Sequence, residues 1–372
     1  MRQATDNKPG DDGVQLPRTC RPPSWRAVGF AHKNEQQMFI TSGGAEVCLS
    51  IRTACGLRGV SLAAATSDGT AAGTRAGKNM IMDYGVCEPA RLGQTQLLDG
   101  RLLGWAEWGP TDGTPVLFCP GAATSRWLGF GGGVIDAAGI RLISVDRPGL
   151  GASDPAPGRT LTSWATDMRH LIQEQALRAP SAVGFSQGAP FALALAADGL
   201  VNAVAVVSGS DELAHPRFTH ALAPQVRGMV NAVAADPDAA EASFAGFGSA
   251  DALWDLIIAT SPEADRTVYT DPVFQRAFRR AMDEAFSQGP AGYARDTVLA
   301  MGLWPFDPAD IAVPVELWYG EQDTSPVHSP DLGESLTRMI PKATRHLLPA
   351  AAGSLLWTHA EAVLRTLLAH AR

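Results

Sequence analysis

Residues 182–193 read AVGFSQGAPFAL, and this stretch decides the fold. An apolar run of strand length ends at Ser186, and a helical composition begins at Gln187. Gly184 and Gly188 flank the serine at the G-x-S-x-G spacing, which is typical of a strained turn between a strand and a helix. Small residues at these two positions leave room for the crossing backbone. The pattern predicts a serine hydroxyl that faces the positive end of a helix.

Short apolar runs and helical patterns alternate on both sides of this stretch. The segments 94–98 and 102–108 flank Asp99-Gly100, which is a hairpin signal. Strands are then predicted at 115–119, 141–145, 182–185, 201–207, 313–319 and 344–348, and helices at 161–176, 187–197 and 355–371. This alternation indicates an α/β fold with a mostly parallel sheet covered by helices on both faces.

Four further stretches extend the pattern. They are the residues 119–126, the Asp-Arg-Pro-Gly-x-Gly-x-Ser run at 146–153, Tyr-Gly-Glu-Gln-Asp at 319–323, and Leu-Pro at 348–349 before a last helix. Together with G-x-S-x-G they resemble the α/β-hydrolase superfamily, and above all its proline-iminopeptidase-like and esterase-like members. The resemblance covers residues 93–372 and implies the α/β-hydrolase fold.

The resemblance also implies roles for individual residues. Ser186 matches the nucleophile, and Asp323, at the end of a strand, matches the acid. The main-chain amides of Gln187 and Ala122 match the two donors of an oxyanion hole. Relatives usually carry His-Gly where this chain has Pro120-Gly121, so we expect the loop that contains Gly121 to be held differently.

The histidine of the family is missing from its usual place. Residues 348–357 read LPAAAGSLLW, with Ala352 or the pair Gly353-Ser354 at the expected position. A serine without a base in hydrogen-bond reach is a poor nucleophile. His328 follows Asp323 by five residues, and we expect a structural role for it at the pocket rim. We therefore predict an incomplete triad.

Two other titratable groups remain open as alternatives. Asp211 ends the sixth predicted strand, where some members of the superfamily place their acid, and we rank it after Asp323. His215, with His220, stands at the start of a long helical insertion that would cover the site. His215, like His328, is kept as an alternative acid or base, although no histidine is a convincing one.

The predicted domain organisation has three parts. Residues 1–92 lack a sustained period and are expected to form an irregular or disordered leader, with a lid or partner segment as the alternative. Residues 93–210 and 311–372 form the core, and 211–310 form a helical cap. The cap holds many aromatic residues, which either form its own core or roof an organic substrate. Trp127 is a candidate lining residue of the same pocket, together with Gly121.

Composition excludes several classes of function. The 372-residue chain has a net charge of −8, and residues 93–372 hold 30 Asp/Glu against 19 Lys/Arg, which argues against nucleic acid. No CxxC pair, P-loop or H-E-x-x-H motif occurs, so neither a metal nor a nucleotide cofactor is expected. No apolar run is long enough to cross a membrane, and no secretory signal is recognised, so a cytoplasmic location is expected.

We therefore expect a cofactor-free serine enzyme that acts on a small organic ester, lactone or related acyl compound. One alternative is a non-hydrolytic lyase or cyclase that uses the same pocket, which loss of the base would favour. The other is an inactive homologue that only binds its ligand. The expected partner is a small-molecule substrate, and neither its identity nor the oligomeric state follows from the sequence.

Overall fold

The computed structural model describes residues 39–42, 45–48 and 84–370. The chain divides into two units, Met1–Ala54 and Cys55–Arg372. In the first unit, β1 (Phe39–Ser42) pairs antiparallel with β2 (Ala45–Cys48). The rest of the predicted leader up to residue 83 lies outside the described residues.

The second unit is built around an eight-stranded sheet in the order β10-β9-β8-β7-β5-β6-β4-β3. Its strands are β3 (Arg91–Gln96), β4 (Leu102–Trp108), β5 (Thr114–Cys119), β6 (Ile140–Val145), β7 (Ser181–Phe185), β8 (Val204–Val207), β9 (Val315–Gly320) and β10 (Ala343–Leu348). Strands β5 to β10 are parallel to one another, and β3 and β4 add the predicted antiparallel edge. The predicted mostly parallel sheet and its opening hairpin are confirmed.

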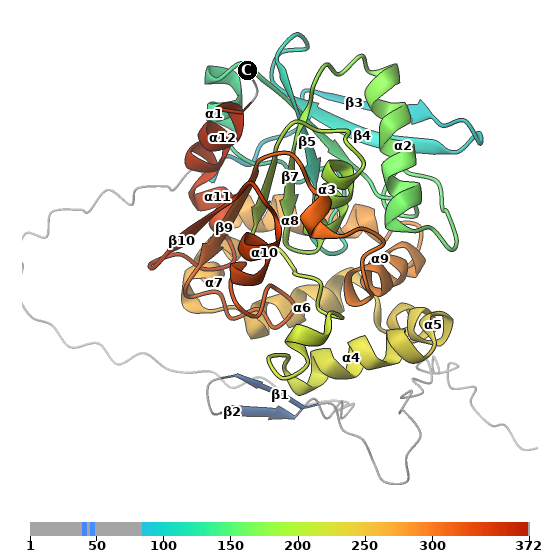
Figure 1. The fold of residues 1–372 in the computed structure, drawn as a ribbon, viewed down its shortest axis with the longest axis vertical. Helices are drawn as coiled ribbons and strands as arrows, with labels where there is room; N and C mark the ends of the chain where they lie inside the picture. Colours follow the sequence, from blue (N-terminus) through green and yellow to red (C-terminus); the bar gives the residue numbers. More distant parts are fainter. Residues whose placement is uncertain (1–38, 43–44, 49–83, 371–372) are drawn as a thin grey trace, which may run out of the picture. The chain divides into compact units, whose positions relative to one another are not determined.

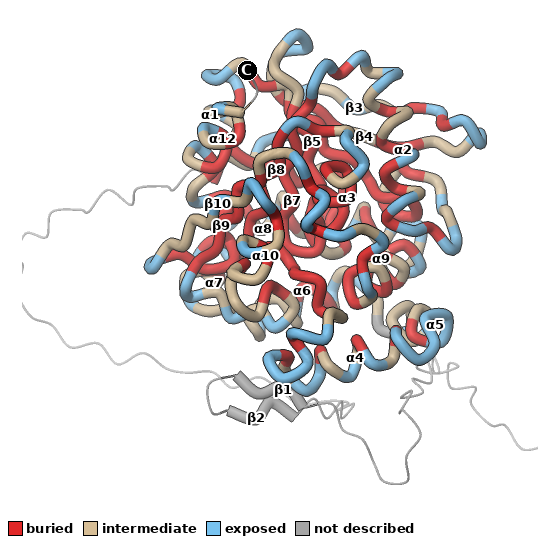
Figure 2. Tube along the Cα trace, in the orientation of Figure 1, coloured by how far each residue is buried: buried red, intermediate tan, exposed pale blue. Residues whose placement is uncertain are grey.

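Helices cover both faces of this sheet, as Figure 1 shows. One face carries α1 (Gly132–Ala137), α11 (Leu355–Thr358) and α12 (Ala360–Leu368), and the other carries α2 (Leu161–Glu174), α3 (Ala189–Ala197) and α10 (Glu334–Met339). The predicted last helix is divided at His359, where the backbone leaves the helical conformation. The central strands β7 and β8 are buried along their whole length (Figure 2). Their continuous apolar sequence reflects burial on both faces.

The folded chain of the second unit begins before Gly93, the predicted boundary. Tyr84 is buried in the core, and its ring meets Phe274 edge-on at 6.0 Å. The indole N–H of Trp108 donates to the carbonyl of Cys87 at 3.0 Å. Residues 84–90 form no regular element, but further contacts hold them, among them the Gly132 amide on the Gly85 carbonyl at 3.0 Å and the Ala90 amide on the Glu107 carbonyl at 2.8 Å.

Six helices lie between β8 and β9, within the insertion expected at 211–310. They are α4 (Pro224–Ala235), α5 (Pro237–Phe247), α6 (Ala250–Thr260), α7 (Glu263–Tyr269), α8 (Pro272–Ala285) and α9 (Ala291–Met301). Short 3₁₀ turns at Pro216–Phe218 and Pro308–Asp310 lead into and out of them. We call residues 211–310 the cap. Several of its aromatic side chains pack on one another and on Trp357 of α11, so the cap and the sheet share one apolar core.

Candidate functional site

Ser186 stands in the strained turn that the sequence predicts. Its φ is +51°, a left-handed conformation that is rare for a residue with a side chain. A Cβ at Gly188 would lie 2.0 Å from the carbonyl oxygen of Cys119, and one at Gly184 would lie 2.8 Å from the Cβ of Ala192. The expected need for small residues at these two positions is confirmed. Strain at Ser186 is maintained by the packed strand and helix on either side of it.

His328 is the hydrogen-bond partner of the Ser186 hydroxyl. Its Nε2 lies 2.8 Å from Ser186 Oγ, and its Nδ1 lies 2.6 Å from Asp323 Oδ2. All three side chains are almost completely buried. Burial opposes a charge on the imidazole, but the charge and hydrogen bond of Asp323, together with the charge of Asp265, raise the pKa of His328 above its usual value.

The loop after β9 folds back to bring this histidine to the serine. The other oxygen of Asp323 accepts the Ser325 amide at 3.0 Å, and the His328 amide donates to the Ser325 carbonyl at 3.3 Å. Beyond it, the Ser329 amide donates to the carbonyl of Gly209, which follows β8. Asp323 and His328 therefore lie in a single turn, which is held at one end by β9 and at the other by the contact between Ser329 and Gly209.

His328, kept as an alternative base although a structural role was expected for it, is the histidine that stands beside Ser186. The loop after β9, which carries His328, leaves the strand next to β10 at the same end of the sheet as the loop after β10. The sequence signal was the Asp-Thr-Ser-Pro-Val-His stretch at 323–328, which has a turn-forming centre between two groups that can bond each other.

The loop that contains Gly121 is held by a buried arginine. Arg147 donates to the carbonyl of Pro120 at 2.6 Å and to the carbonyl of Gly121 at 2.8 Å. In a trans peptide the N–H points opposite to the carbonyl, so the Ala122 amide points away from Arg147. Gly121 lies next to the serine, because a Cβ built on it would be 3.6 Å from the Ser186 Cβ. The amides of Ala122 and Gln187 have no acceptor among the described residues.

Arg147 is itself fixed by the cap. Its Nε lies 2.7 Å from Asp296 Oδ2 on α9, and both side chains are fully buried. Arg159 binds the other oxygen of Asp296 at 2.5 Å, so two guanidinium groups share one carboxylate. The side-chain amide of Gln187 also reaches α9, where it lies 3.4 Å from Thr297 Oγ1. Sequence reasoning missed this cluster, because nothing in the helical pattern of the cap indicates where Asp296 meets the core.

The loop after β10, where relatives carry the histidine, is closed by a different cap residue. Asp265 of α7 accepts the amides of Gly353 at 3.0 Å and Ser354 at 2.7 Å. The preceding residues cross the end of β9, because a Cβ on Gly320 would lie 2.3 Å from the Ala351 carbonyl oxygen. The loop thus contributes its Gly353 and Ser354 amides to this region, and the Ser354 side chain also bonds Asp265.

The two remaining alternatives do not contact the serine. Asp211 is fully buried, accepts the Glu212 amide at 2.8 Å and the Ser329 hydroxyl at 3.2 Å, and burial raises its pKa to about 7. His215 accepts from the main chain and side chain of Arg217. Asp211 therefore holds Ser329, the residue after His328, whereas His215 caps the 3₁₀ turn that leads into the cap.

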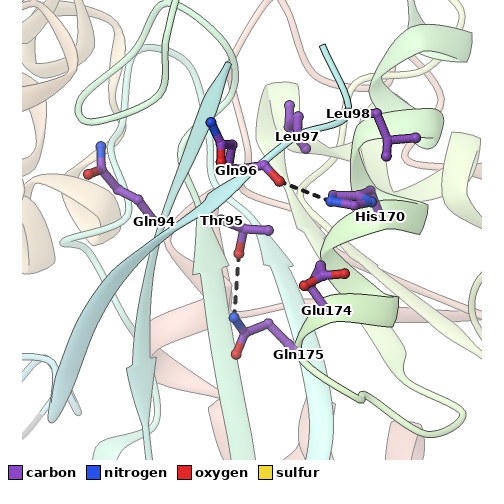
Figure 3. Close-up of a pocket in the computed structure, with 8 residues that line it drawn as sticks. All are labelled: Gln94, Thr95, Gln96, Leu97, Leu98, His170, Glu174 and Gln175. Atoms are coloured by element: carbon purple, nitrogen blue, oxygen red, sulfur yellow. Dashed lines mark hydrogen bonds between the residues drawn. The ribbon is translucent and has the colours of Figure 1, made fainter. Parts of the chain in front are cut away.

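Trp127, expected to line the pocket, packs against the cap. The guanidinium of Arg280, on α8, lies 3.5 Å from the centre of its ring. Ser186, whose exposed fraction is 8%, lines neither of two cavities found among the described residues. One cavity of about 400 Å³ lies between β3 and α2 (Figure 3), where His170 Nε2 is 2.9 Å from the Gln96 carbonyl oxygen. The other, of about 540 Å³, lies between α4, α9 and the start of α2.

None of the helices in the described part of the chain is both long and apolar enough to cross a membrane. Across residues 39–42, 45–48 and 84–370, no group of three or more His, Cys, Asp or Glu side chains is arranged to hold a metal ion.

Comparisons with known proteins agree with this architecture. Residues 116–366 match the family model described as "Alpha/beta hydrolase family". A non-heme chloroperoxidase from Streptomyces lividans is 33% identical over 104 residues, which cover 26% of this chain and 36% of that protein. The match thus spans about a third of the curated relative.

Solved structures with the same fold are more distant in sequence. An esterase from Rhodococcus sp. superposes with a TM-score of 0.54 at 21% identity, covering 75% of this chain and 98% of its own. The enol-lactonase from Burkholderia xenovorans has a TM-score of 0.55 at 18% identity, covering 75% and 99%. A bromoperoxidase from Bacillus anthracis has a TM-score of 0.53 at 18% identity, with the same two coverages. At these identities the likeness shows the fold alone.

Proposed function

Because the chain belongs to the alpha/beta hydrolase family, we propose that it is a serine hydrolase of small organic esters, lactones or related acyl compounds. The observation that carries the proposal is the hydrogen-bonded series from Ser186 through His328 to Asp323. A serine, a base and an acid joined in this order form the constellation that makes a hydroxyl nucleophilic on unrelated folds.

Each residue has a defined step in the proposed reaction. His328 Nε2 takes the proton of Ser186 Oγ as that oxygen bonds to the ester carbonyl carbon, while the ionised Asp323 accepts a hydrogen bond from Nδ1–H and stabilises the imidazolium. The carbonyl oxygen becomes an oxyanion that the amides of Gln187 and Ala122 stabilise. His328 then returns the proton to the leaving alkoxide as the carbon–oxygen bond breaks. In the second step the same imidazole deprotonates a water molecule, whose oxygen bonds to the acyl carbon. The bond between that carbon and Ser186 Oγ then breaks, His328 returns the proton to Oγ, and the carboxylic acid leaves.

Arg147 supports the oxyanion step without touching substrate. By holding the carbonyls of Pro120 and Gly121 it fixes the peptide plane from which the Ala122 amide projects. It replaces the support expected from the histidine that relatives carry where this chain has Pro120. The lyase and inactive-homologue alternatives rested on the absence of a base, and the contact between His328 and Ser186 removes that ground.

A fluorophosphonate probe tests the proposal. We expect one covalent adduct on the intact protein, located at Ser186, and hydrolysis of short-chain p-nitrophenyl esters that stops when the adduct forms. Ser186→Ala is expected to lose both. Ser210→Ala is the matched control, since its main-chain amide donates to the Ser186 carbonyl while its hydroxyl has no partner among the described residues. Equal labelling of wild type and Ser186→Ala, or no labelling of either, would refute the proposal.

A further inference from the structure

Asp265 places a second carboxylate beside the candidate triad, and it comes from the cap. Its side chain is 3% exposed, and its two oxygens accept the amides of Gly353 and Ser354. These amides belong to the loop where relatives carry their histidine. The carboxylate therefore binds the main chain at the position from which that imidazole is missing.

Gly353 lies between the two carboxylates. A Cβ built on it would be 3.0 Å from Asp265 Oδ2 and 3.4 Å from Asp323 Oδ1. Both oxygens therefore face the same point, one from the cap and one from the loop after β9. A side chain at this position would separate them, so a residue without one allows the close approach.

We propose that Asp265 is a positioning residue for the triad: it fixes the loop after β10 to the cap and adds a second negative charge to the surroundings of the His328 imidazole. It touches neither Ser186 nor a reacting atom, and it acts through Gly353, Ser354 and His328. The cap thereby contributes to the protonation of the base as well as to the cover of the site.

The charges around His328 agree with this assignment. Asp323 contacts it from its own loop, and Asp265 and Tyr269 face the region from α7, where burial raises the Tyr269 pKa well above its usual value. Asp211 and Asp331 stand behind the adjoining Ser329. Burial also raises the pKa of Asp265, while its bonds to Ser354 and Gly353 oppose that rise. The imidazolium is thus favoured by two carboxylates from two elements.

The first test is an NMR titration of the imidazole nitrogens in the full-length chain, with His328 identified by its loss in His328→Gln. In Asp265→Asn the negative charge is gone, so we expect the pKa of His328 to fall by roughly one unit. Only the activity measurement rests on the proposed function. A general base must be unprotonated to act, so the acid limb of the pH profile of kcat/KM should move to lower pH by the same amount.

Hydrogen exchange tests the loop contact. Asn can still accept one of the two amides, and Ala can accept neither. We expect the Gly353 and Ser354 amides to exchange about tenfold faster in Asp265→Ala, with a smaller increase in Asp265→Asn. Asp271→Asn is the matched control, since Asp271 also accepts two successive amides in the cap but lies at the start of α8.

The outcomes are distinct. A lower His328 pKa in Asp265→Asn, with no change in Asp271→Asn, supports the positioning role even if the protein hydrolyses no ester tested. An unchanged His328 pKa, or unchanged exchange at Gly353 and Ser354 in Asp265→Ala, overturns it. Failure of the fluorophosphonate experiment alone would instead count against the serine hydrolase and leave this proposal standing.

Discussion

The loops after β9 and β10 leave neighbouring parallel strands at the same edge of the sheet, yet they serve the candidate site differently. The loop after β9 contributes side chains, with Asp323 and His328 five residues apart in one turn. The loop after β10 contributes main-chain amides, which Asp265 holds. In this chain the place beside Ser186 is filled from the end of β9, so the position of a histidine along the chain does not by itself decide whether it reaches the serine.

The largest effect is expected from His328. His328→Ala removes the only imidazole that contacts Ser186 among the described residues, and kcat/KM for a p-nitrophenyl ester should fall about 10⁶-fold. His359→Ala is the control, because this partly exposed imidazole bonds the adjacent Thr358 hydroxyl. Steady-state kinetics with circular dichroism to confirm folding would measure both. Activity near the wild-type level in His328→Ala would show that the loop after β9 does not supply the base.

A smaller effect is expected from the acid. In Asp323→Asn the amide donates to Nδ1, which forces the proton onto Nε2 and leaves no acceptor for the serine, so kcat/KM should fall about 10⁴-fold. Asp211→Asn can keep its bond from the Glu212 amide, and we expect less than about a threefold change. The reverse order of these two losses would assign the acid to the strand end after β8.

Gly353→Ala probes the crowded loop. The added Cβ would press on both Asp265 and Asp323, and we expect a loss of about 1–3 kcal/mol in the free energy of unfolding. Gly133→Ala, in α1, has nothing within 4 Å of its Cβ and should raise that free energy by up to about 1 kcal/mol. Urea denaturation would measure both. Similar effects at the two positions would show that the loop after β10 is not tightly packed.

The smallest expected effect is an absence of rescue. When Gly353→His is added to His328→Ala, the imidazole has to enter between two carboxylates on a loop fixed to the cap, so we expect no recovery of ester hydrolysis beyond about twofold. Initial rates of the double variant against His328→Ala would measure this. A recovery of tenfold or more would mean that this loop can still present a base.

Local patterns in the sequence predicted most of the fold. The runs that became β5 to β9 are largely apolar because these strands are buried, and the glycines around Ser186 are required by contacts that any such turn makes. The candidate site was predicted less well. Ser186 and Asp323 follow strands and could be placed from them, whereas His328 reaches the serine through a turn whose path depends on the Ser329 contact with Gly209.

The residues of the cap that support the site could not be placed at all. Asp265 and Asp296 lie on helices whose sequences indicate only amphipathic segments, and each meets a partner far away in the chain. Contacts between distant segments of this kind depend on how the helices are arranged over the sheet, and no local period records that arrangement.

The shared carboxylate of Asp296 has a consequence for protein engineering. Exchanging or trimming the insertion is a natural way to change which molecules enter a hydrolase of this kind, but here it would strip Arg147 of its counter-ion inside a dry interior, where an isolated charge is unstable. Designs that replace the cap therefore have to retain α9 or supply another anion beside Arg147, because that arginine fixes the loop from which the Ala122 amide projects.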